Sequence, residues 1–109
     1  METKLGKIQY VHYGACGYQE AMLGLRVTLG GDGWGVRADK PGHWATTRSD
    51  STNWTESDRI EALGKNAWEI NQMLVDAKVD SVDKLLGIPV ECIFDGNMLR
   101  SWRILKEVL

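Results

Sequence analysis

The chain has 109 residues, a formal net charge of −2, 43% hydrophobic residues and 26% charged residues. This length allows one domain, residues 1–109, with one modest core, because domains cluster near roughly 100–150 residues. The negative charge argues against a polymeric nucleic acid as ligand, since such binding depends on many neutralised phosphates. A small anionic ligand, which needs only two or three well-placed cations, is compatible with it.

The chain shows no sign of a targeting or membrane segment. Residues 1–10 are polar and mixed, and no apolar run approaches the roughly 20 residues that a spanning helix needs. Cys16 and Cys92 are far apart and lack the spacing of a zinc site. We therefore expect a soluble protein with free thiols in a reducing cytoplasm.

The first forty residues follow the two-residue period of β-strands, interrupted by glycine. Residues 7–13 and 22–29 both alternate, the latter with Leu23, Leu25, Val27 and Leu29 on one face, and residues 14–17 separate them. These two segments are expected to form an antiparallel pair. A glycine-rich turn at 30–33 leads to a third short strand over 34–38, Pro41 and Gly42 indicate another turn, and residues 45–54 are typical of a polar loop.

A long helix is expected next. Thr55 and Asp58 have the spacing of a capping box, and apolar residues then recur every three or four positions to about Lys78: Ile60, Leu63, Ala67, Ile70, Leu74 and Ala77. A helix of about 24 residues is roughly 36 Å long, which is long for a domain whose radius of gyration is about 13 Å. We expect part of it to pack on another protomer.

The C-terminal segment has the pattern of a hairpin. Residues 81–86 suit one helical turn, and strands over 88–94 and 98–105 flank the turn sequence Asp95-Gly96-Asn97. The predicted order is β-β-β-α-β-β. The fold class is therefore α+β, with a small antiparallel sheet of three N-terminal strands and a C-terminal hairpin, one long helix, and an oligomeric state.

Tryptophan and arginine supply the clearest binding signal. Four of the five tryptophans lie outside the helix: Trp34, Trp44, Trp54 and Trp102. An indole stacked on a base contributes roughly 1–3 kcal/mol, and a guanidinium matches phosphate geometry. Large aromatics also commonly form the core of a small domain, so each tryptophan is as well explained by a structural role.

The last strand carries two arginines. Simple alternation places Arg100 and Trp102 on one face, and Arg103 with Leu99 and Leu105 on the other. A cation among leucines requires a partner, which is either a carboxylate or a phosphate in an interface pocket. Arg100 is more simply part of a solvated edge.

Catalytic and metal signals are weak. His12 and His43 are the only histidines, and neither has a ligand-spaced partner; His12 suits a structural role and His43 a loop near a ligand. No nucleophile motif or nucleotide fingerprint is present, although the glycines around Tyr18, Gln19 and Trp34 could form an anion-binding nest. We expect no catalytic residue, metal or cofactor.

Four segments carry a resemblance to a known family: GYQEAMLG at 17–24, GGDGWG at 30–35, WTESDR at 54–59, and IPVECIFDGNMLRSWRIL at 88–105. In this order they resemble the first-described Thoeris anti-defence family, phage proteins that sequester cyclic ADP-ribose signals. The resemblance implies a non-enzymatic sponge in the bacterial host cytoplasm, which binds a glycocyclic ADP-ribose made by an immune enzyme and withholds it from the effector. It also implies a homodimer whose pockets combine two chains, or a hexamer that also holds cyclic oligonucleotides.

The resemblance also points to ligand-binding positions. Arg103 matches an arginine on the last strand, whereas a second basic position falls at Met22, for which Arg26 on the same strand face is the expected substitute. Together with the aromatic and glycine patterns, the candidate ligand-binding residues are Tyr18, Gln19, Met22, Arg26, Trp34, Trp44, Arg100 and Arg103.

The sequence is also compatible with two other functions. A phage structural or adaptor protein would use the helix for assembly and the aromatics as core, and would ignore nucleotides. An enzyme that cleaves or isomerises a nucleotide would return an altered ligand.

Overall fold

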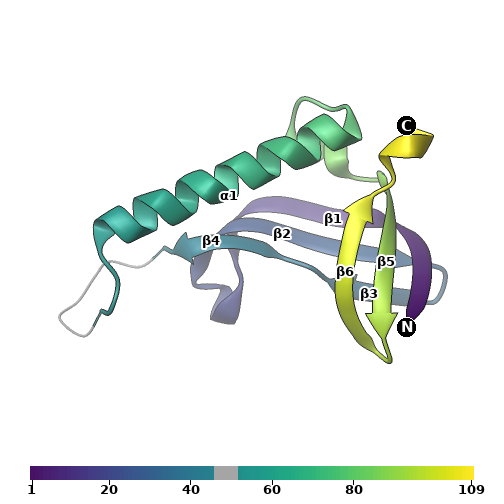
Figure 1. Cartoon of the computed structure of the whole chain (residues 1–109), viewed down its shortest axis with the longest axis horizontal. Coiled ribbons are helices and arrows are strands. Elements are labelled where there is room, and N and C mark those ends of the chain that lie inside the picture. The colour runs from purple at the N-terminus through teal and green to yellow at the C-terminus, as the bar shows by residue number, and fades with distance from the viewer. Residues whose placement is uncertain (46–51) are drawn as a thin grey trace.

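The computed structural model describes residues 1–45 and 52–109 (Figure 1). The strands are β1 (Glu2–Cys16), β2 (Met22–Gly31), β3 (Trp34–Arg37), β4 (Lys40–Trp44), β5 (Pro89–Asp95) and β6 (Met98–Ile104). The helix α1 spans Glu56–Ala77, and short 3-10 turns occupy Tyr18–Glu20 (η1), Val82–Leu85 (η2) and Lys106–Val108 (η3). One long helix and a six-stranded antiparallel sheet confirm the predicted α+β class.

The long strand β1 connects the two halves of the sheet, whose order is β3-β2-β1-β5-β6 with β4 also paired to β2. Its first residues, from Glu2 to Lys7, pair with β5, and its remainder pairs with β2. Figure 1 shows β5 and β6 running across the direction of β2 and β4, with β1 curving from one half into the other. The sheet is therefore strongly bent.

The strand β4 was not predicted. Pro41 and Gly42, expected to form a turn, lie within β4, which pairs with β2 from Met22 to Leu25. Proline is tolerated here because β4 is an edge strand and the register shifts at this point. The strand β1 also begins at Glu2 rather than Lys7, and residues 46–51 of the expected polar loop lie outside the described residues.

The helix begins where the sequence predicts. Thr55 Oγ1 accepts the N–H of Asp58 at 3.0 Å, and Asp58 Oδ2 accepts the N–H of Thr55 at 2.8 Å, which confirms the capping box. The helix ends at Ala77, and Lys78 then adopts a left-handed conformation with a φ of 58°. Its 22 residues are close to the expected 24.

The predicted apolar stripe of α1 was wrong at two positions. Ile60 is 69% exposed and Ala67 is also exposed, whereas the buried residues are Asn66, Ile70, Met73 and Ala77. The buried face could not be recognised from apolar residues alone, because it includes the polar residue Asn66. The Asn66 Nδ2 group donates to the Lys40 carbonyl at 3.0 Å. The opposite face carries exposed Ile60, Trp68 and Val75, and packing of α1 on another protomer stays a prediction.

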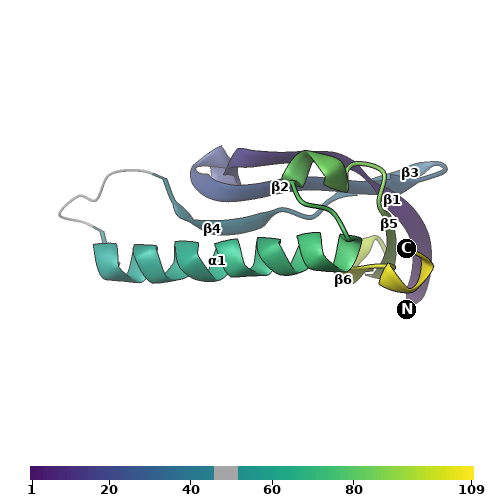
Figure 2. The ribbon, with the colours of Figure 1, turned by 90° about the horizontal axis from the view of Figure 1, so that it is seen from above.

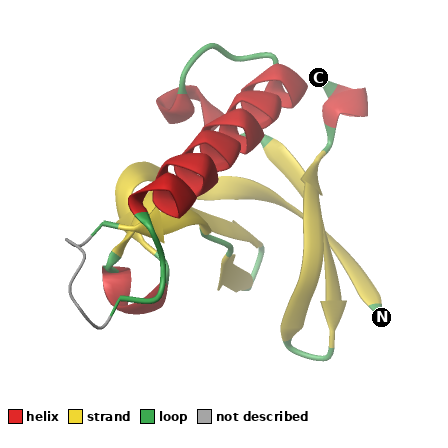
Figure 3. Cartoon of the chain, turned by 60° about the vertical axis from the view of Figure 1, so that its left-hand side comes forward, coloured by secondary structure: helices red, strands yellow, loops and turns green. Residues whose placement is uncertain are grey.

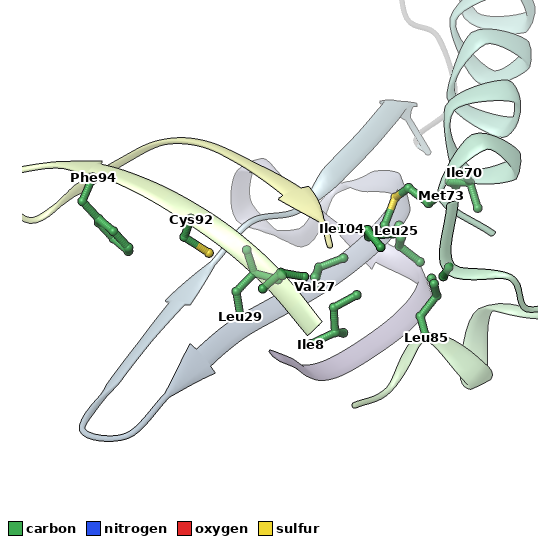
Figure 4. Packing of buried hydrophobic residues seen from close by; sticks show 12 residues of the cluster. Ile8, Leu25, Val27, Leu29, Ile70, Met73, Leu85, Cys92, Phe94 and Ile104 are labelled. Carbon is green, nitrogen blue, oxygen red and sulfur yellow. The ribbon is translucent and has the colours of Figure 1, made fainter. Parts of the chain in front are cut away.

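The core lies between α1 and the sheet. Figures 2 and 3 show α1 on one side of the sheet, and Figure 4 shows β2, β5 and α1 contributing side chains to one cluster. Its buried members are Ile8, Leu25, Val27, Leu29, Ile70, Met73, Ala77, Leu85, Val90, Cys92, Phe94 and Ile104.

Candidate functional site

The strongest candidate site is a pocket where β6 and the start of β4 meet the C-terminal half of α1. We call it the Trp102 pocket; its volume is about 250 Å³, and it is lined by Lys40, Met73, Asp76, Trp102, Arg103, Ile104 and Lys106. Three cationic residues and one carboxylate line it. The lining residues thus carry a formal charge of +2 (three cations and one carboxylate) on a chain whose net charge is −2.

An ammonium group lies on the indole of this pocket. Lys40 Nζ is 5.2 Å from the centroid of the Trp102 ring, within the range of a cation–π interaction. The hydrogen bond from the buried Asn66 side chain fixes the Lys40 carbonyl, and hence the start of β4. The ring and the charge are therefore held together by elements that are distant in sequence.

Arg103 lies at the edge of the pocket and is paired with two carboxylates. Its Nε donates to Glu91 at 3.1 Å, and its NH1 donates to Glu107 at 3.0 Å. Hydrogen bonds to Glu107 and Glu91 raise the pKa of Arg103, and the bond from Arg103 lowers the pKa of Glu107. The partner of this cation in the structure is therefore a carboxylate. An anionic ligand that binds Arg103 must share it with Glu107 or displace the Glu107 side chain.

The predicted face of Arg103 was wrong. The register of β5 with β6 shifts between Ile93 and Phe94, so that Phe94 faces Leu99 and Ile93 faces Ser101. Arg100 is therefore the extra residue of a β-bulge. Residues 98 and 99 consequently face the opposite sides of the sheet from those that simple alternation predicts. Leu99 and Trp102 consequently pack against the core, whereas the Arg103 side chain is 48% exposed.

The positive charge of the pocket is completed by the C-terminal turn. Lys106 Nζ lies 3.9 Å from the Asp76 carboxylate of α1, and both side chains line the pocket. Such an exposed pair contributes little to stability. Lys106 is therefore available to a competing anion at small cost.

Four predicted ligand residues lie together at the other end of β4. Met22 pairs with Trp44 across the β2–β4 ladder, and the rings of Tyr18 and Trp44 meet edge to face with centroids 6.4 Å apart. Gln19, in η1 beside Tyr18, has a left-handed φ of 53°. Because each strand residue advances about 3.3 Å, Trp44 is about 13 Å along β4 from Lys40, so these residues do not join the Trp102 pocket.

Arg26 is bound to the same η1 turn. Its NH2 group donates to Glu20 and forms an ion pair with it. The hydrogen bond from Arg26 lowers the pKa of Glu20. Arg26 lies on the same face of β2 as Met22, as expected, but neither residue lines the pocket that contains Arg103.

Trp34 and Arg100 occupy a third region. The Trp34 ring packs edge to face on Phe94 with centroids 5.6 Å apart, and Lys4 Nζ lies 5.7 Å from the Trp34 ring. Trp34 thus contributes to the core cluster. Arg100 donates to Asp95 at 3.1 Å in the exposed β5–β6 hairpin, as expected for a solvated edge.

Sequence reasoning missed Lys40, Asp76 and Lys106. Lys40 precedes a Pro-Gly pair that predicts a turn, and nothing local indicates that this segment reaches Trp102. Asp76 and Lys106 have no motif around them. The pairing of β4 with β2 positions Lys40, whereas α1 and the C-terminal turn bring Asp76 and Lys106 to the same pocket.

The described residues form no metal site and contain no activated thiol. Among residues 1–45 and 52–109, no three His, Cys, Asp or Glu side chains gather in a way that could hold a metal ion. Cys16 and Cys92 are free and buried, and burial raises the pKa of both thiols. Neither is an activated nucleophile, because the thiolate is the reactive form.

Comparison of the chain with protein-family models, curated proteins and solved structures finds no match. Within the described part of the chain, no helix is long and apolar enough to cross a membrane.

Proposed function

We propose that the protein is a phage anti-defence sponge, which binds a cyclic ADP-ribose-type immune signal in the host cytoplasm and withholds it, unchanged, from its effector. The observation that carries this proposal is the Trp102 pocket, where an indole lies beside Lys40, Arg103 and Lys106. The sequence resemblance supports it independently, because its most specific segment, residues 88–105, contains Trp102 and Arg103.

The chemistry of the pocket suits this ligand class. A cyclic ADP-ribose combines a pyrophosphate with a base and two riboses in a compact molecule, so it needs few cations and one stacking surface. Guanidinium and ammonium groups bind phosphate oxygens. The Trp102 indole, on which Lys40 now lies, would offer its face to the base when Lys40 turns to a phosphate. A polymeric nucleic acid would need a longer positive track.

The size of the pocket limits what one chain can enclose. Drug-sized ligands usually occupy pockets of about 300–1,000 Å³, and the Trp102 pocket has about 250 Å³. We propose that it receives the charged part of the signal and that the rest contacts a second protomer of a homodimer or hexamer. The residues around Tyr18 and Trp44 are available for such a contact from a neighbouring chain.

The test is a thermal-shift series with cyclic ADP-ribose isomers and cyclic di- and trinucleotides, followed by recovery of each ligand and mass spectrometry. Ligand at 100 times its Kd stabilises by about 2.7 kcal/mol, which should raise the midpoint by roughly 10 °C or more. One stabilising ligand recovered intact supports sequestration. An altered ligand would instead indicate a nucleotide-processing enzyme.

The exposed helix face favours a second candidate, a phage structural or adaptor protein. Ile60, Trp68 and Val75 are 69%, 62% and 60% exposed on α1, which is a surface suited to assembly. This candidate predicts no thermal shift with any nucleotide of the series. Micromolar or tighter binding of one of them would exclude it as the main function.

A further inference from the structure

The strand β1 has one long edge that is not covered. Its pairing with β5 ends at Lys7, and at Ile8 the edge is closed by two hydrogen bonds. Gly87 N–H donates to the Ile8 carbonyl at 2.8 Å, and Ile8 N–H donates to the Ile88 carbonyl at 3.0 Å. From Tyr10 to Cys16, β1 is paired with β2 on one side alone.

Backbone groups on this edge point outward. Val27 uses its carbonyl to accept from Ala38 N–H and its N–H to donate to Asp39, both on the side of β2 away from β1. Since the hydrogen-bonding direction alternates along a strand, Val11, which faces Val27, directs its N–H and C=O away from β2. Tyr13 and Ala15 follow at steps of two, and no described residue pairs with these groups.

The edge also lacks the charged residues and prolines that commonly keep edge strands apart, although a bulge lies at its start, between Ile8 and Tyr10. Residues 9–16 contain no Lys, Arg, Asp, Glu or Pro, whereas exposed edges of stable monomers are usually protected by such residues. The side chains of Tyr10 and Tyr13 are 48% and 46% exposed. A long, uncharged edge of this kind is a template for strand pairing.

We propose that this edge pairs, antiparallel, with the same edge of a second copy of the chain, about a two-fold axis at Tyr13. The open segment runs from Tyr10 to Cys16, so its midpoint sets Tyr13 opposite the partner's Tyr13. Val11 then lies opposite the partner's Ala15, which places a branched side chain against a small one. Two uncharged edges meet without like charges in opposition.

The ends of the paired segments do not oppose this pairing. Lys7 lies before the open edge, and Glu20, which is paired with Arg26, lies in the turn after it, so antiparallel pairing brings no like charges together at the ends of the two strands.

Sedimentation velocity of the unliganded protein tests the interface. Wild type is expected to be dimeric at micromolar concentration. Tyr13→Lys sets two ammonium groups opposite each other, and Tyr13→Pro removes an N–H that faces the open edge, a position where proline is tolerated. Both variants should be monomeric, and their thermal midpoints should be close to that of wild-type monomer prepared by dilution. The matched controls Ser101→Lys, on the exposed strand β6, and Trp68→Lys, on α1, should remain dimeric.

A cross-linking experiment tests the register directly. Hydrogen-bonded antiparallel residues have Cα atoms about 5.5 Å apart, which is within disulfide range. Tyr13→Cys should therefore give a disulfide-linked dimer under mild oxidation, whereas Ser101→Cys should not. Cys16 and Cys92 are buried and do not compete.

Three results would overturn this interface: a monomeric wild type, a dimeric Tyr13→Lys variant, or loss of the dimer in Trp68→Lys alone, which would assign dimerisation to α1. The interface identifies a partner surface for the homo-oligomer proposed above and rests on that proposal only for its biological role. No ligand is used in these measurements, so their failure is distinguishable from a failure of signal binding.

Discussion

The Asp39 carboxylate accepts the backbone N–H of Val27 at 3.1 Å, in the gap between the two strands that share one edge of β2. The same carboxylate accepts from Gly17 N–H at 3.2 Å and from Arg37 at 2.7 Å. The Asp39 side chain thus accepts the Val27 N–H at the point where β3 has ended and β4 has not yet begun. It also connects this edge to the turn after β1.

Asp39 should make the stability of the fold depend on acid. Burial raises the pKa of Asp39, but hydrogen bonds from Arg37, Gly17 and Val27 outweigh burial, so that its pKa lies below the usual value. A depressed pKa stabilises the folded state above the unfolded pKa of about 3.9, and this stability is lost as pH falls through the folded pKa. We expect Asp39→Asn to unfold more readily at pH 7 and to show a flatter loss of stability below pH 4, as measured by urea unfolding. Asp95→Asn, on an exposed hairpin, is the control, and equal pH profiles for wild type and Asp39→Asn would contradict this role.

The features of the fold that can be predicted are those formed by residues close together in the sequence. Thr55 and Asp58 predicted the start of α1 because a capping box is formed by residues three apart. The turn at Gly96 was equally clear, since its φ of 62° suits the Asp-Gly signal. Lys40 to Trp44 could not be predicted as a strand, because its pairing depends on a bulge at Gly42 and on the Lys40 carbonyl, which Asn66 holds.

The candidate site was less predictable than the fold for the same reason. Arg103 and Trp102 were visible as residue types, but the bulge at Arg100 changes which of them faces the core. Lys40 reaches Trp102 from a segment more than sixty positions earlier in the chain, and no local pattern encodes that approach. Residues singled out one by one thus fall into three separate regions.

Two glycines should respond in opposite directions to the same substitution. A Cβ at Gly6 would lie 2.4 Å from the Gly30 carbonyl oxygen and 2.8 Å from the Trp34 ring, whereas a Cβ at Gly64 meets nothing within 4 Å. We expect Gly6→Ala to destabilise by about 2 kcal/mol or more, since overpacking commonly costs 1–3 kcal/mol. Gly64→Ala, in an exposed part of α1, should stabilise by about 0.5–1 kcal/mol. Chemical unfolding measures both, and a destabilising Gly64→Ala would mean that another surface approaches this helix closely.

Glu107 should compete for Arg103 with the ligand proposed for the Trp102 pocket. It accepts two hydrogen bonds from Arg103 at 3.0 Å, so an anion must replace these contacts. Glu107→Gln keeps the shape of the side chain and removes its charge; we expect affinity for the cyclic signal to rise several-fold, with little change in thermal midpoint because exposed ion pairs contribute about 0–1 kcal/mol. Isothermal titration calorimetry gives the affinity. Weaker binding by Glu107→Gln would show instead that the carboxylate orients Arg103 for the ligand.

Arg103 and Arg100 provide the sharpest comparison within the proposed site. Both are exposed arginines of β6 in ion pairs, but Arg103 lines the Trp102 pocket, whereas Arg100 is bound to Asp95 in the hairpin. A hydrogen bond to a charged group contributes about 1.5–3 kcal/mol, so Arg103→Ala should weaken signal binding by roughly 10- to 100-fold. Arg100→Ala should change it less than threefold. Calorimetric titration at two salt concentrations measures both losses. The loss in Arg103→Ala should shrink as salt screens the contact, and equal losses in the two variants would place the ligand away from the Trp102 pocket.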